Sequence, residues 1–266
     1  TFPLLAAACC ALACTQFKSG SDIGIDSGSF SSSPESPAQS SEWSCLATPR
    51  STAAPLVLGN TNVTYTMFIA DTVSRKPPPG LVVSACSPLD IDCMNPVADS
   101  VPPGADGFVR LSVPQNFSGF FIVKSSETVN SVLFIDGPIT ADMTAPPMLV
   151  IGEAALQTLT QTQNVNIQMG TGNLLLRAWD CDQMPASGVQ FSSDHGGVPF
   201  SFVNTLPVVG QTVTDDDGAG GFLNVSPGLA IVKATLADGT VTRTSTGRVS
   251  ANWFTYVDLN AKAPSP

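Results

Sequence analysis

From Pro55 onward, apolar residues come in short runs that alternate with polar residues and are separated by turn residues. A period of two places every second side chain on one face, which is typical of strands with one buried side. Helical periodicity is weak over most of this region. The pattern predicts five strands in its first part, at residues 63–71, 81–86, 108–113, 120–124 and 131–135.

A second series of predicted strands repeats the order of the first. The corresponding segments are 63–71 and 174–180, 81–86 and 189–193, and 108–124 and 222–233, and the last pair is interpreted as a hairpin in each copy. In this alignment Gly107 matches Gly221, and each glycine precedes a Phe that we expect in a core. Three more predicted strands, at 198–203, 241–248 and 253–259, extend the second copy.

Many short strands with regular turn signals favour an all-β fold of two tandem β-sandwiches, because each sheet has one face to bury against another. We place the first sandwich at residues 51–144 and the second at 145–266. Ala155, Leu156 and Leu159 share one helical face, so a short helix is expected at 151–160. We expect this helix to pack beside the second sandwich.

The turn motifs carry a family resemblance. Those of the second copy are Leu-Arg-Ala-Trp-Asp (176–180), Pro-Ala-Ser-Gly (185–188), Thr-Asp-Asp-Asp-Gly (214–218) and Phe-Leu-Asn-Val-Ser-Pro-Gly (222–228). This pattern resembles the carboxypeptidase regulatory-like, or transthyretin-like, β-sandwich family, and the first copy is similar at Pro79-Gly80 and Asp106-Gly107-Phe108. The matches cover roughly residues 55–260, and the resemblance implies accessory domains without catalytic residues of their own. The whole layout also resembles bacterial surface lipoproteins built from tandem copies of this sandwich.

The N-terminal segment suggests export. Residues 1–13 are interpreted as a signal peptide, because their apolar run is too short for the roughly 20 residues of a membrane span and ends in small residues. Cleavage after Ala13 would leave Cys14 at the new N-terminus. This resembles the lipobox of bacterial lipoproteins, except that Leu12 stands two places before the cysteine where the lipobox has three. The resemblance implies a lipid anchor at Cys14, a membrane partner and an outer-membrane location; secretion without lipid is the alternative.

Residues 14–50 are rich in Ser, with scattered Gly and Pro. Such a segment cannot bury enough apolar surface to offset its ordering entropy, so it predicts a disordered tether after the lipidated cysteine. Trp43 and Cys45 mark where folded structure begins.

Charge and composition limit the possible partners. The chain has 21 acidic and 11 basic residues and a formal net charge of −10. Nucleic acids and anionic lipid head groups are bound by clustered Lys and Arg, and they repel an acidic chain. Nucleic acid is therefore not expected as a partner. The chain has one histidine, which limits metal and acid–base chemistry. No cofactor is expected.

Four cysteines follow Cys14, and an even number in an exported protein favours disulfides. Cys86 and Cys93 can close a short loop after a strand. Cys45 and Cys181 then remain, and their pairing would tie the end of the tether to the second copy. Sequence alone does not settle this connectivity.

Two features suggest chemistry, each with a simpler explanation. Asp90 with Asp92, and the Asp215–Asp217 turn, offer oxygen ligands for calcium, but neither has the spacing of an EF-hand, and Asp-rich turns are common without metal. His195 lies in a loop with nearby hydroxyls, yet no Gly-x-Ser-x-Gly motif accompanies it. We therefore expect no metal site and no catalytic residues.

Trp179, Trp253 and Tyr256 are candidates for a glycan-stacking surface, although aromatic residues on strands more often lie in a core. The favoured function is a non-catalytic, structural or adhesive cell-envelope lipoprotein that binds protein or glycan. A carbohydrate-binding module is the first alternative. A secreted hydrolase around His195 is the second.

Overall fold

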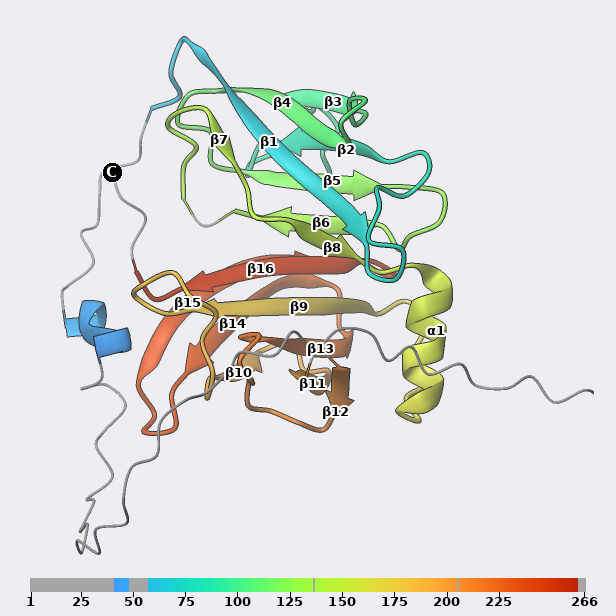
Figure 1. Ribbon diagram of the computed structural model, residues 1–266, viewed down its shortest axis with the longest axis vertical. Coiled ribbons are helices and arrows are strands. Elements are labelled where there is room, and N and C mark those ends of the chain that lie inside the picture. Colours follow the sequence, from blue (N-terminus) through green and yellow to red (C-terminus); the bar gives the residue numbers. More distant parts are fainter. Residues whose placement is uncertain (1–40, 48–56, 136, 205, 263–266) are drawn as a thin grey trace, which may run out of the picture. The chain divides into compact units, whose positions relative to one another are not determined.

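A computed structural model describes residues 41–47, 57–135, 137–204 and 206–262 of the chain (Figure 1). The predicted signal peptide and Cys14 lie outside the described residues. The strands of the first half are β1 (Asn62–Asp71), β2 (Val82–Cys86), β3 (Ala98–Val101), β4 (Phe108–Pro114), β5 (Phe120–Lys124), β6 (Ser131–Phe134), β7 (Met143–Thr144) and β8 (Met148–Val150). Those of the second are β9 (Gly172–Trp179), β10 (Gln190–Ser193), β11 (Val198–Val203), β12 (Leu206–Val209), β13 (Ala219–Val225), β14 (Gly228–Thr235), β15 (Val241–Val249) and β16 (Phe254–Asn260). The all-β sandwich fold is confirmed, and a short helix, α1 (Glu153–Thr162), separates the two series.

Alternation of apolar and polar residues places the strands in the fold. In β4, Val109, Leu111 and Val113 are fully buried, whereas Arg110 and Ser112 between them are exposed. The strand therefore has one core face and one solvent face. The strands missed from the sequence, β3, β7, β8 and β12, have two to four residues each, too few for the alternation to stand out.

Each half contains two facing sheets with the same pairing order. In the first half β1 pairs with β4 and, in parallel, with β7 and β8, while β5 lies between β2 and β6. In the second half β9 pairs with β13 and, in parallel, with β16, while β14 lies between β10 and β15. The predicted repeat is therefore present in the strand pairing.

The hairpins expected at 108–124 and 222–233 are absent, because the two strands of each pair lie in different sheets. β4 pairs with β1 whereas β5 pairs with β2 and β6. Similarly, β13 pairs with β9 and β11, and β14 with β10 and β15. In the first half, Phe117 in the connection is only 2% exposed and its ring lies 5.8 Å from that of Phe121. The connection thus crosses the edge of a core and supplies one of its side chains.

The turn before β4 corresponds to the turn before β13. Gly107 N donates to Gly104 O, and Gly218 N donates to Asp215 O in the same way. Both glycines have positive φ, 81° and 60°, a region that glycine adopts without strain. Gly218, and not Gly221, is therefore the partner of Gly107. Gly221 lies inside β13, where a Cβ would stand 2.0 Å from the carbonyl oxygen of Leu174.

One sheet runs through both halves. Its nine strands have the order β12-β11-β13-β9-β16-β6-β5-β2-β3, and β16 lies between β9 and β6, parallel to both (Figure 1). We call this the shared sheet. β8 follows the boundary proposed at 144/145 yet pairs with β1, so the first half extends to Val150. The described residues belong to one compact unit, Glu35–Pro266.

The two main cores lie on opposite faces of β9 and β16. Phe254 and Tyr256 of β16 are buried in the first core, whereas Val257 and Leu259 are buried in the second. α1 also contributes to the first core, through Leu156. The helix was expected beside the second sandwich. Its apolar face instead covers a core that both halves build, because the shared sheet brings residues of β11 and β13 into the first core.

The folded part of the chain begins within the segment assigned to the tether. Ser41–Ala47 forms a 3-10 helix, η2, in which Trp43 is 3% exposed and packs into the second core. Trp43 and Cys45 belong to the folded structure. Residues 41–47 are therefore not part of a disordered tether, because one buried indole and one disulfide fix them.

Candidate functional site

The three aromatic residues proposed for glycan stacking do not share a surface. Tyr256 is 7% exposed and belongs to the first core, where burial raises the pKa of its hydroxyl well above the usual 10. Trp253 and Trp179 are half-buried. Asn173 N, near the start of β9, donates to Trp253 O, whereas Trp179 ends that strand, so six residues or roughly 20 Å separate them. A sugar ring cannot span that distance.

Trp179 belongs to a polar cluster on β9 and β16. Its Nε1 donates to Asp258 Oδ1 over 3.1 Å, and the Arg177 guanidinium lies 4.9 Å from its ring centre. Arg177 Nε also donates to Asp258 Oδ1, over 2.9 Å. These contacts occupy the indole N–H and one ring face, and they fix the pairing of the two strands. The cluster therefore has a structural role.

His195 makes backbone contacts. Its Nδ1 lies 3.0 Å from the carbonyl oxygen of Ser226, and its ring packs against Gly228, where a Cβ would stand 2.6 Å from Cε1. Asp194 Oδ1 accepts from Ile231 N, and Ser193 Oγ accepts from His195 N. In a hydrolytic triad the imidazole bonds to a nucleophile and an acid. Here Nδ1 faces a carbonyl, and the neighbouring hydroxyl and carboxylate each bind a backbone amide.

The acidic turns are held by hydrogen bonds to the chain itself. Asp90 accepts from Met94 N and Asn95 N, at 3.0 and 2.6 Å, and Asp92 pairs with Arg248 at 2.6 Å. Hydrogen bonds from the backbone N–H groups of Asn204 and Asp216 lower the pKa of Asp215. Among the described residues, no three His, Cys, Asp or Glu side chains are grouped as metal ligands would be.

Both proposed disulfide pairings are present. Cys86 and Cys93 are joined across a sequence separation of 7, and Cys45 and Cys181 across a separation of 136. Cys86 packs with Phe120 and Val132 in a small third cluster on the shared sheet. Disulfides persist in oxidising compartments, which agrees with export.

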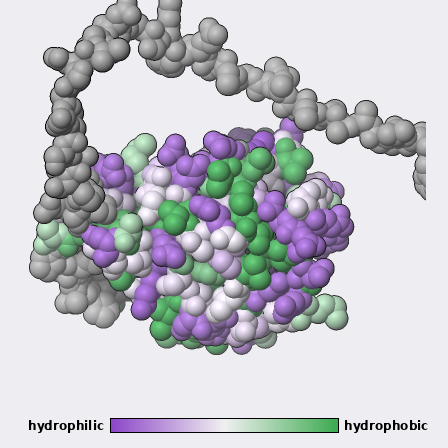
Figure 2. Space-filling view, turned by 90° about the horizontal axis from the view of Figure 1, so that it is seen from below, coloured by the Kyte–Doolittle hydropathy of each residue, from purple (hydrophilic) through white to green (hydrophobic). Residues whose placement is uncertain are grey.

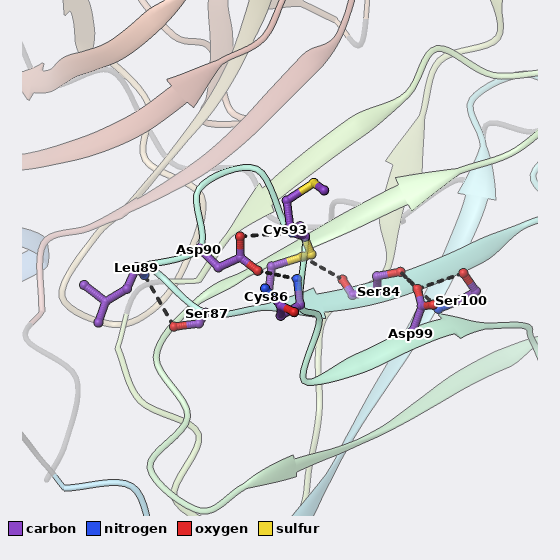
Figure 3. Close-up of a disulfide and its surroundings, with 10 residues drawn as sticks. Ser84, Cys86, Ser87, Leu89, Asp90, Cys93, Asp99 and Ser100 are labelled. Carbon is purple, nitrogen blue, oxygen red and sulfur yellow. Dashed lines mark hydrogen bonds between the residues drawn. A yellow bond between two sulfur atoms is a disulfide. The ribbon is translucent and has the colours of Figure 1, made fainter.

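The shorter bridge closes a loop that presents apolar side chains to solvent, a feature that the sequence reasoning missed. We call Cys86–Val97 the stapled loop. Leu89 is 93% exposed and Met94 77% exposed, and Ile91 and Val97 are also exposed. Figure 3 shows Leu89 pointing away from the disulfide while the Asp90 carboxylate turns back toward the loop. The sequence did contain a signal for this exposed surface. In residues 86–97, large apolar residues alternate with Asp, Pro and Asn, which are typical of exposed loops.

Several contacts hold the stapled loop in one conformation. Besides the disulfide and the two bonds to Asp90, the Asp92–Arg248 ion pair joins the loop to β15 of the second half. Ser87 Oγ accepts from Leu89 N. A loop that is ordered before binding loses less entropy when a partner docks. Its exposed apolar side chains and fixed backbone make it the best candidate contact surface.

Other exposed apolar residues are more scattered. Leu206 on β12 and Leu229 and Ile231 on β14 are 66%, 56% and 44% exposed. Figure 2 shows apolar residues interspersed with hydrophilic ones on the face seen from below. A depression of about 300 Å³ lies against β10 and β14, lined by Ser192, Ser193, Asp194, Ile231 and Lys233. Two of its polar side chains bind the backbone: Ser193 Oγ accepts from His195 N and Asp194 Oδ1 accepts from Ile231 N.

No protein-family model matches the chain, and no curated protein matches it either. Among solved structures, it is similar to BcpA, the major pilin subunit of Bacillus cereus, with 12% identity, a TM-score of 0.27, and coverage of 75% of this chain and 99% of that one. The shaft pilin SpaA from Lactobacillus rhamnosus GG matches with 11% identity and a TM-score of 0.22, over 77% of this chain and 99% of SpaA. The Bacillus anthracis TIE protein matches with 13% identity and a TM-score of 0.25, over 75% of this chain, which spans about a third (34%) of that protein. These TM-scores are too low to support an inference about function.

Proposed function

We propose that the chain is a non-catalytic structural or adhesive module of the cell envelope, and that it contacts a protein through the stapled loop. The observation that carries the proposal is the fixed stapled loop, with exposed Leu89 inside its disulfide-closed part and exposed Met94 directly after Cys93. A few side chains that enter well-packed pockets on a partner carry most of the binding energy of an interface. The exposed side chains of the loop are apolar, so it fits an apolar pocket on a partner.

The alternatives have weaker support. A carbohydrate-binding module would need two or more exposed aromatic rings on one face, whereas Tyr256 is buried and the two tryptophans lie apart. A hydrolase around His195 would need that imidazole beside a nucleophile, and its Nδ1 faces Ser226 O.

We also propose a lipid anchor at Cys14, an outer-membrane location, and membership of the carboxypeptidase regulatory-like family. In the described residues no helix is both long and apolar enough to cross a membrane. Mass spectrometry of protein made in a bacterial host would test the anchor. An N-terminal Cys14 that carries lipid is expected, and a soluble protein with unmodified Cys14 would leave plain secretion.

Binding to immobilised purified extracellular proteins and to a glycan array tests the function. We expect binding to a protein, weakened at least tenfold when Leu89→Ser and Met94→Ser are combined. Met169→Ser is the matched control, because Met169 is 96% exposed and lies outside the loop. Binding to glycans alone, or protein binding that the loop variant leaves unchanged, would contradict the proposal. So would hydrolysis of a substrate that is lost in His195→Ala.

A further inference from the structure

The chain that precedes β1 is attached to the second half. Cys45 is bonded to Cys181, which follows β9, and Cys181 N donates to Glu42 O over 2.9 Å. Trp43 is buried in the second core. A force applied to the N-terminal side of η2 therefore reaches the turn after β9 before it reaches β1.

The C-terminal end of the fold is attached at the same place. Asn260 is in register with Trp179 across the β16–β9 pair, and Ala261 N donates to Trp179 O over 2.9 Å. Thus both ends of the described chain are fixed within two residues of Cys181.

The Cys45–Cys181 bridge closes a covalent loop across a sequence separation of 136. That loop contains the whole first half, α1 and β9. Tension between the two ends passes from η2 through the S–S bond to Cys181 and then along the chain to Ala261. It does not pass through the segments inside the loop.

We propose that this disulfide decides which part of the fold bears a pulling force. When it is closed, only the segment from Cys181 to Ala261 can be extended, and the first half is held out of the load. When it is open, the whole fold is in line with the force. The path of the force follows from the fold alone. Only its relevance in the cell rests on the proposed structural function.

The geometry also identifies the strand that yields first. β9 and β16 are parallel, and the two points of load lie at the same end of both strands. Such a load pulls the ends of the two strands apart, across the strands and not along them. It therefore breaks the hydrogen bonds of β16 one pair at a time, beginning at Asn260. Loss of β16 withdraws Tyr256 from the first core and Leu259 from the second.

Opening the bridge is a two-electron reduction. A dithiol such as dithiothreitol supplies two electrons and two protons, so the S–S bond becomes two thiols and the dithiol becomes a cyclic disulfide. The Cys86–Cys93 bridge lies inside the covalent loop. Its state therefore does not change the length available while Cys45–Cys181 is closed.

Single-molecule pulling on the two ends of the full chain tests the proposal. At up to 3.6 Å per residue, unfolding of the oxidised protein should release roughly 29 nm of chain, and of the dithiothreitol-treated protein roughly 78 nm, an increase of about 2.7-fold. A Cys45→Ser, Cys181→Ser variant should release the longer length without reductant. A Cys86→Ser, Cys93→Ser variant should keep the shorter length.

Release of the longer length by the oxidised wild type would overturn the proposal. So would release of only the shorter length by the Cys45→Ser, Cys181→Ser variant. The released length does not depend on any binding partner, so the adhesion assay can fail while this inference stands, and the reverse also holds.

Discussion

The two disulfides close loops of very different length, and their removal should cost different amounts of stability. In the chain-entropy model a bridge stabilises the fold by restricting the unfolded chain, more strongly for a longer loop. A separation of 136 between Cys45 and Cys181 gives about 5 kcal/mol, and a separation of 7 between Cys86 and Cys93 gives about 2.4 kcal/mol. The expected difference is about 2.6 kcal/mol.

The perturbation is the replacement of each pair by alanine in separate variants. Cys181 and Cys86 are both buried, at 8% and 0% exposure, so each change also removes one buried sulfur and the packing losses are similar. Since domains are stable by about 5–15 kcal/mol, loss of the longer bridge should remove a large share of the total.

Equilibrium urea unfolding at pH 7 measures both variants against the oxidised wild type. With a slope of about 2.5 kcal/mol per molar urea, the Cys45→Ala, Cys181→Ala variant should unfold at a midpoint lower by about 2 M. The Cys86→Ala, Cys93→Ala variant should shift by about 1 M. Equal shifts, or a larger shift for the shorter bridge, would refute the loop-entropy reasoning.

Two further perturbations test local features. Gly221→Ala should destabilise the protein more than Gly170→Ala in the same urea assay, because a Cβ at Gly221 would meet Leu174 O. A Cβ at Gly170 meets nothing within 4 Å, so that change adds only about 1–3 kcal/mol of backbone strain. Equal losses of stability in the two variants would contradict the close approach at Gly221. The Arg110 guanidinium lowers the pKa of Asp106 from 3.8 to about 2, so this pair stabilises the fold above about pH 4, and that contribution is lost as pH falls toward 2. Arg110→Ala should raise the NMR titration midpoint of the Asp106 carboxyl toward 3.8, although the hydrogen bond from Phe108 N still lowers this pKa. An unmoved midpoint would exclude Arg110 as the main cause.

The sequence predicts strands wherever the alternation is long enough. β1 and β9 are both predicted, and an Asp at the end of each caps the next turn. Asp71, the last residue of β1, accepts from Ser74 N, and Asp180, which follows β9, accepts from Met184 N. This shared capping explains why the corresponding segments 63–71 and 174–180 both end in Asp. The turn chemistry is local, so one sequence suffices to read it.

Pairing between distant segments is not written in local patterns. A Pro- and Gly-bounded connection such as 114–119 joins strands equally well within one sheet or between two sheets. Only the buried Phe117 separates the two cases. The parallel pairing of β6 with β16 joins residues more than a hundred positions apart, and the alternation of each strand is satisfied with any neighbour.

The candidate site shows the same division. The short spacing of Cys86 and Cys93 indicated one disulfide, whereas the pairing of Cys45 with Cys181 was left open by the sequence and is fixed by the fold. Exposure did not follow, because a strand residue such as Tyr256 faces a core or solvent according to which sheet covers it. The exposed side chains of the stapled loop depend on the same tertiary information.

The shared sheet makes the two halves one body. Differential scanning calorimetry of the oxidised protein tests it most directly, together with a Leu223→Ala variant. Leu223 lies in β13 of the second half, is fully buried and packs into the first core, so its truncation should cost about 2–5 kcal/mol. We expect one unfolding transition, with equal calorimetric and van't Hoff enthalpies, that moves as a whole to lower temperature in the variant. Two separate transitions, only one of which moves, would contradict it.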